Sequence, residues 1–181
     1  MQAPSVPLLP RDFPGARLRR LRTTDLAAFQ AYRSIPELGR YQGWSPMSDA
    51  DAQAFLVAMS EARLFVPGRW VQLGIAESET DRLIGDIGLH LSEDGLAGEV
   101  GFTLEPVAQG RGIATAAVRE ALDLLFASTS VLAARGVTDS RNLPSVRLLE
   151  RLGFRCRESR DVLFRGEACT EWVYVLTRDR A

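Results

Sequence analysis

Six residues, Gln109-Gly110-Arg111-Gly112-Ile113-Ala114, decide which fold this sequence encodes. They lie between an alternating segment, residues 99–104, which predicts a strand, and a segment whose apolar residues recur at helical spacing. The glycines permit backbone angles that other residues avoid, and the first N–H groups of a helix have no partner inside it. A strand-to-helix turn of this kind is typical of a site that binds phosphate groups.

Other glycine-rich loops fit this stretch less well. A Walker loop requires Gly-Lys-Ser/Thr, whereas Gly112 is followed by Ile113 and the chain contains no lysine. A dinucleotide-binding fingerprint requires a small residue where Thr115 stands, within a parallel βαβ unit. Taken alone, the six residues are equally compatible with a flexible loop that binds nothing.

Length and composition predict a single globular domain. The chain has 181 residues, of which 46% are hydrophobic and 25% charged. Residues 1–15 contain four prolines and predict a flexible leader, and residues 16–181 predict the domain itself. A net charge of −1 argues against nucleic acid as a partner, and no apolar run is long enough to cross a membrane.

The few soft ligands argue against a metal site. Cys156 and Cys169 lack metal-like spacing, and His90 is the single histidine of the chain. We therefore expect no metal. Free thiols and the absence of a signal-peptide pattern predict a cytoplasmic protein.

Hydrophobic periodicity predicts an α/β order of elements. Strands are expected at residues 17–22, 70–77, 83–91, 98–104, 131–138, 154–164 and 171–177. Helices are expected to begin near Thr24, Ser48, Ile113 and Pro144, where capping residues or proline precede an apolar periodic segment. Arg165-Gly166-Glu167 would form the turn of the last hairpin.

Two motifs of this sequence resemble those of a known protein family. The Gln-x-x-Gly-x-Ala pattern from Gln109 to Ala114 resembles the acetyl-coenzyme A pyrophosphate loop of the GNAT superfamily of N-acetyltransferases. A second motif, Asn142-x-x-Ser145 followed by Leu152-Gly153-Phe154, is similar to the branch that contains ribosomal-protein N-terminal (alanine/serine) acetyltransferases. The resemblance implies the GNAT fold (α/β, or α+β). Its mixed, mostly antiparallel sheet has about seven strands, is splayed between the fourth and fifth, and carries helices on both faces.

The resemblance also implies acetyl-coenzyme A as cosubstrate. The loop amides would hold the pyrophosphate, and the edge of the splayed strand would pair with the pantetheine arm. The residues implied in cofactor binding are Phe102, Thr103, Leu104, Gln109, Gly110, Arg111, Gly112, Ile113, Ala114, Thr115, Asn142 and Ser145. Plainer roles remain open for three of them: a solvated arginine for Arg111, a helix cap for Asn142 and a first-turn hydroxyl for Ser145.

Glu99 is the expected catalytic base, acting through water on the attacking amine. If the hairpin centres between Asp94 and Gly95, His90 lies opposite Glu99 on the same face, which makes it a second catalytic candidate. A structural role for this pair is the alternative. Ser145 is a third candidate because the resemblance places it near the thiol. Many relatives carry a tyrosine general acid where this chain has Leu149.

Tyr41, Trp44 and Asp86 are the candidates for the lining of the acceptor site, and a packing role is the favoured alternative for the two aromatic residues. The acceptor is expected to be the α-amine of a protein or peptide. Removing its proton at neutral pH costs about 1 kcal/mol, against roughly 4.6 kcal/mol for a lysine. A small amine such as an aminoglycoside or a polyamine is the second hypothesis. A non-catalytic acetyl-coenzyme A-binding module is the third, and a homodimer is compatible with all of them.

Overall fold

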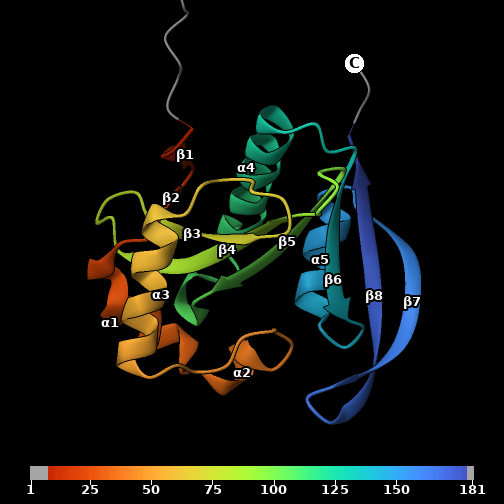
Figure 1. The fold of residues 1–181 in the computed structure, drawn as a ribbon. Coiled ribbons are helices and arrows are strands. Elements are labelled where there is room, and N and C mark those ends of the chain that lie inside the picture. The colour runs from red at the N-terminus through yellow and green to blue at the C-terminus, as the bar shows by residue number, and fades with distance from the viewer. Residues whose placement is uncertain (1–7, 179–181) are drawn as a thin grey trace, which may run out of the picture.

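The protein folds around one eight-stranded sheet, described by a computed structural model for residues 8–178. Its strands are β1 Arg11–Phe13, β2 Ala16–Arg20, β3 Trp70–Glu77, β4 Leu83–Leu91, β5 Ala97–Leu104, β6 Ala133–Asp139, β7 Arg155–Phe164 and β8 Glu167–Thr177. They lie in the order β1-β2-β3-β4-β5-β6-β8-β7, and the β5–β6 pair is parallel while the others are antiparallel. The predicted mixed, mostly antiparallel sheet is therefore confirmed (Figure 1).

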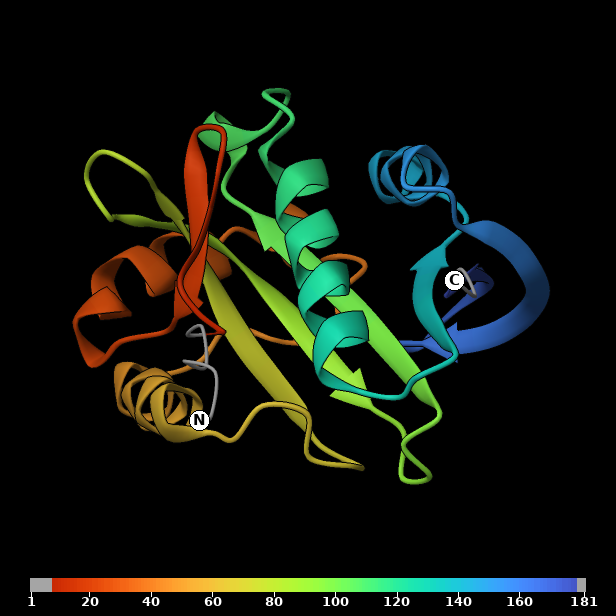
Figure 2. The ribbon, with the colours of Figure 1, turned by 90° about the horizontal axis from the view of Figure 1, so that it is seen from above.

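Helices cover both faces of this sheet, as predicted (Figure 2). They are α1 Leu26–Arg33, α2 Pro36–Gly39, α3 Asp49–Glu61, α4 Ile113–Ser128 and α5 Leu143–Arg151, with 3-10 turns η1 Thr23–Asp25 and η2 Pro106–Ala108. The apolar stripe of α4 packs with Val100 and Leu104 of β5 into the main core. On the opposite face, α1 and α3 bury Phe29, Tyr32 and Leu56 in a second cluster. Packed side chains thus cover both faces of the sheet, and α4 holds β5 from one of them.

The sheet begins earlier in the chain than the sequence indicated. Residues 11–13 were expected in a flexible leader but form β1, which pairs with β2 and makes eight strands rather than about seven. A three-residue strand is too short to give a periodic signal, so this part of the leader prediction is corrected. Residues 1–7 of the expected leader lie outside the described residues.

β5 and β6 separate along their length, as the resemblance implied. Their parallel pairing joins residues 97–99 to residues 133–135, and beyond this point the strands part (Figure 1). The continuations of both strands lead directly to the two predicted motifs, because α4 follows β5 and α5 follows β6. The open end of this split therefore brings together segments that are far apart in the sequence.

Candidate active site

A cavity of about 640 Å³ occupies the open end of the split. Its walls come from the end of β5, the loop into α4, the exposed face of α5 and the α2 region. The lining residues are Glu37, Leu38, Tyr41, Gln42, Phe102, Thr103, Leu104, Ala108, Gln109, Gly110, Gly112, Ile113, Ala114, Thr115, Asn142, Pro144, Ser145, Arg147, Leu148 and Arg151. Both sequence motifs therefore line one cavity, on opposite sides of it.

The N-terminus of α4 presents unpaired N–H groups at this cavity. Gly112 is the N-cap and supplies no side-chain cap, and the first helical bond runs from the Ala116 N–H to the Gly112 carbonyl. The N–H groups of Ile113, Ala114 and Thr115 thus have no partner within the helix. Gly110 and Gly112 have φ of +75° and +78°, and the space where a side chain would begin is open at both. A negatively charged group can approach this helix end closely.

The edge of β5 supplies further polar groups. The Glu105 N–H donates to the Ile84 carbonyl, so in this antiparallel pair the odd-numbered residues of β5 bond to β4. The N–H and carbonyl of Phe102 and Leu104 therefore face the split, whereas the N–H of Thr103 faces β4. The N–H of Phe102, and not that of Thr103, can therefore donate to a group bound in the split.

Two glutamines brace this edge from either end of the cavity. The Gln42 amide donates to the Phe102 carbonyl at 3.1 Å, and the Gln109 amide donates to the Leu104 carbonyl at 2.9 Å. Gln109 thereby ties the glycine loop to the end of its strand. Gln42 was not predicted, because a loop residue 60 positions from its partner carries no local signal.

α5 begins with the residues of the second motif. The Asn142 side chain accepts the Ser145 N–H at 3.5 Å, so Asn142 caps the helix and also lines the cavity. Ser145 is half-buried on the same wall. Leu149, which stands at the position where relatives carry a tyrosine, is buried against Gly136 instead.

Glu99 and His90 are cross-strand partners, which confirms the predicted hairpin register. Neither lines the cavity: Glu99 lies where β5 and β6 still pair, opposite Arg135. Burial raises the pKa of Glu99, against the opposing effect of the positive charges of His90, Arg135 and Arg160. Beside Glu99 on this face, the space where a Gly101 side chain would begin is open.

Asp86 does not line an acceptor site, which corrects the sequence prediction. It projects to the predicted face but is fully buried, because α1 packs over it. Its carboxylate accepts hydrogen bonds from Tyr32, from the Arg33 guanidinium at 2.9 Å and from Gln72 at 2.6 Å. Asp86 therefore anchors α1 to the sheet.

The two predicted aromatic residues have different surroundings. Trp44 does not line the cavity: its ring lies 4.3 Å from the Arg33 guanidinium, and its N–H donates to the Thr103 hydroxyl at 3.4 Å. Trp44 thus packs the loop onto the sheet. Tyr41 does line the cavity and lies between the guanidinium groups of Arg40 and Arg141.

The loop arginine of the first motif also lies outside the cavity lining. Glu77 has a lowered pKa because of the hydrogen bond from Thr80, with smaller contributions from the charges of Arg82 and Arg111. Arg111 therefore lies within electrostatic range of Glu77, although no ion pair joins the two. Two arginines that were not predicted, Arg147 and Arg151, line the cavity instead. The helical spacing of residues 144, 147, 148 and 151 was the available signal for this face.

Between residues 8 and 178, no three His, Cys, Asp or Glu side chains are grouped so that they could hold a metal ion. Within the same residues, no helix has the length and apolar character needed to cross a membrane.

Comparisons with known proteins agree with this geometry. The model of the acetyltransferase (GNAT) domain family matches residues 16–155. An uncharacterized N-acetyltransferase, p20, from Bacillus licheniformis is 29% identical over 140 residues, which cover 76% of this chain and 78% of that protein.

Solved structures share the fold. A GNAT-family acetyltransferase from Bacillus anthracis superimposes with a TM-score of 0.82 at 18% identity, covering 93% of this chain and 98% of that one. RimL, a ribosomal L7/L12 alpha-N-protein acetyltransferase solved in complex with coenzyme A, gives 0.77 at 12% identity, covering 91% and 95%. The family match spans most of the chain, so this protein belongs to the GNAT acetyltransferase family and is an acetyl-coenzyme A-dependent N-acetyltransferase.

Proposed function

We propose that this enzyme acetylates the N-terminal α-amine of a protein or peptide, by direct attack of the amine on acetyl-coenzyme A. One observation carries the proposal: the unpaired N–H groups of α4 and the edge of β5 that faces the split line the same cavity. The first fits a diphosphate and the second fits the amide-containing arm that follows it in the cosubstrate.

The cosubstrate supplies a thioester, and the protein supplies the groups around it. The N–H of Phe102 faces the split and stabilises the oxygen that becomes negative when the amine attacks the carbonyl carbon. As the new carbon–nitrogen bond forms and the carbon–sulfur bond breaks, Glu99 accepts the proton of the amine through water. The thiol of coenzyme A is a good leaving group, because its pKa of about 8.5 lies near neutral pH.

The raised pKa of Glu99 suits this role. A base works best when its pKa lies near the working pH, and burial moves Glu99 in that direction. An α-amine needs only about 1 kcal/mol to lose its proton at neutral pH, so a carboxylate acting through water is sufficient. The function ascribed to RimL, whose fold this chain shares, supports an α-amine acceptor. A small amine is the second candidate for the acceptor.

The experiment is a transfer assay with the purified protein. Acetyl-coenzyme A is incubated with peptides of varied first residue, the same peptides with a blocked α-amine, an aminoglycoside and a polyamine, and thiol release is followed. We expect release with free peptides and none with blocked ones. Release with small amines alone would contradict the peptide proposal. Tight coenzyme A binding without release for any amine would favour a binding module.

A further inference from the structure

Arg147 and Arg151 form a pair of positive charges on the cavity face of α5. They stand four positions apart on one helix, so their side chains are neighbours on its surface. Pro144, Ser145 and Leu148 line the same cavity, which fixes the direction of this face. Like charges at this spacing repel each other, so the pair weakens α5 slightly unless an anion lies between or beside them.

No acid among residues 8–178 forms an ion pair with either arginine. None of the ion pairs formed among residues 8–178 includes Arg147 or Arg151. Glu150, which adjoins Arg151, accepts a hydrogen bond from the Tyr174 hydroxyl at 3.1 Å. Glu37 is the single acidic residue of the cavity lining. The cavity therefore carries a surplus of positive charge on its α5 wall.

Coenzyme A carries a phosphate group besides the diphosphate that the N–H groups of the glycine loop would bind. The N–H groups at the start of α4 suit the diphosphate, but the coenzyme bears a separate phosphate on the 3′-hydroxyl of its ribose. Arg111, the arginine of the glycine loop, does not line the cavity. The arginines of α5 line the cavity across from the α4 N-terminus and offer the guanidinium groups that phosphate prefers.

We propose that Arg147 and Arg151 bind the 3′-phosphate of coenzyme A, so that the enzyme distinguishes coenzyme A from its 3′-dephospho form. This inference rests on the proposed function, because it concerns the same cosubstrate. It goes further in assigning residues outside both sequence motifs to a specific group of that molecule.

The test measures binding of coenzyme A and of 3′-dephospho-coenzyme A to the full chain by titration calorimetry, with no need for turnover. The wild type should bind coenzyme A at least about tenfold more tightly than the dephospho form. Arg147→Gln and Arg151→Gln should each reduce this ratio, and the double variant should bring it close to one by weakening coenzyme A alone. Arg147→Lys and Arg151→Lys keep the charge and should retain most of the preference. Arg119→Gln, an exposed arginine on α4, is the matched control and should leave the ratio unchanged.

Three results would overturn the inference. If the wild type binds both ligands equally, the 3′-phosphate is not recognised. If the variants lost affinity for coenzyme A and for its dephospho form equally, the arginines would bind a group that both ligands contain, such as the diphosphate. If the wild type binds neither ligand, the proposed function itself fails and this inference with it; in the first two cases the proposed function stands.

Discussion

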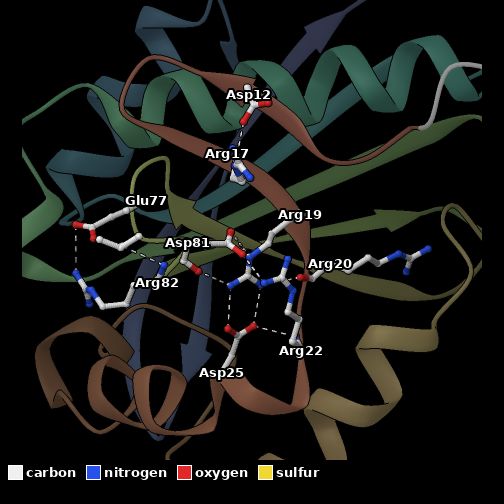
Figure 3. Close-up of polar contacts among 10 residues, drawn as sticks. Asp12, Arg17, Arg19, Arg20, Arg22, Asp25, Glu77, Asp81 and Arg82 are labelled. Atoms are coloured by element: carbon white, nitrogen blue, oxygen red, sulfur yellow. Dashed lines mark hydrogen bonds and ion pairs between the residues drawn. The ribbon is translucent and has the colours of Figure 1, made fainter.

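Arginines in two regions of this molecule differ in whether they pair with acids. Near the β3–β4 turn, Arg19 is 3% exposed and is enclosed by acids: it donates to Asp25 at 2.8 and 2.9 Å and to Asp81 at 3.0 Å (Figure 3). On α5, Arg147 and Arg151 are exposed to the cavity and pair with no acid among the described residues.

The difference separates structural charge from functional charge. A buried arginine must be matched by acids, because an unpaired charge in the interior costs several kcal/mol. An arginine that lines a cavity is solvated until a ligand arrives, so it can remain unmatched at little cost to the fold. In a chain whose 22 basic residues are all arginine, residue type cannot make this distinction, but pairing can.

The largest effect is expected from removing an acid that pairs with the buried Arg19. Asp25→Ala removes the bidentate partner of Arg19 and leaves a buried guanidinium short of hydrogen bonds. We expect the free energy of unfolding to fall by about 3 kcal/mol, measured by urea denaturation. Asp12→Ala removes an acid from the exposed pair with Arg17 and should cost less than about 1 kcal/mol. Equal losses in the two variants would contradict the comparison.

Glu99 extends the comparison to acids, because it is half-buried and joins none of the ion pairs found among the described residues. Glu99→Gln should lower kcat/KM about a hundredfold in the thiol-release assay and leave coenzyme A affinity unchanged. Glu79→Gln, an exposed glutamate in the β3–β4 turn, is the control. A variant that keeps wild-type turnover would remove Glu99 from the mechanism.

The raised pKa of Glu99 also predicts two pH effects. Catalysis requires the carboxylate, so wild-type kcat/KM should fall on acidification from a higher pH than for an ordinary glutamate, and Glu99→Gln should lack this limb. Stability changes in the opposite sense. The folded state holds the proton more tightly, so its contribution is complete below the unfolded pKa and is lost as pH rises through the folded pKa. Stability of Glu99→Gln relative to wild type should therefore rise with pH, as measured by thermal unfolding.

Substitution of Gly112 tests whether the backbone N–H groups at the start of α4 bind coenzyme A. Gly112→Ala places a side chain at φ +78°, which costs about 1–2 kcal/mol of stability, and also obstructs the approach to the α4 N–H groups. Gly95→Ala imposes the same strain at φ +70° in the β4–β5 turn, where the space is equally open. Both variants should be destabilised alike, but Gly112→Ala alone should lose coenzyme A affinity, by about tenfold in calorimetry. If both variants lost coenzyme A affinity equally, the loss would come from backbone strain that disturbs the fold and not from obstruction of the site.

The sequence predicted the parts of the site that are local. The glycine loop, the Asn142 cap and the register that opposes His90 and Glu99 depend on turn chemistry and on spacing within one hairpin or helix. The burial of Asp86 could not be predicted, because its partners Tyr32 and Arg33 lie more than 50 residues away and reach it through the packing of α1. The arginines that line the cavity were not identified from the sequence for the same reason: Arg111 stands in the motif, but the fold places Arg147 and Arg151 in the cavity lining instead.

The smallest effect on stability is expected from replacing Arg147 on α5, which pairs with no acid among the described residues. Arg147→Gln removes one charge of a repelling pair near the middle of α5 and breaks no ion pair found in residues 8–178. The free energy of unfolding without ligand should stay within about 0.5 kcal/mol of the wild type, measured by the same urea denaturation as for Asp25→Ala. With saturating coenzyme A, the wild type should gain more stability than the variant, because a ligand stabilises in proportion to its affinity. A loss of more than about 1 kcal/mol without ligand would mean that Arg147 supports the fold, and the distinction between paired and unpaired arginines would no longer separate structure from function.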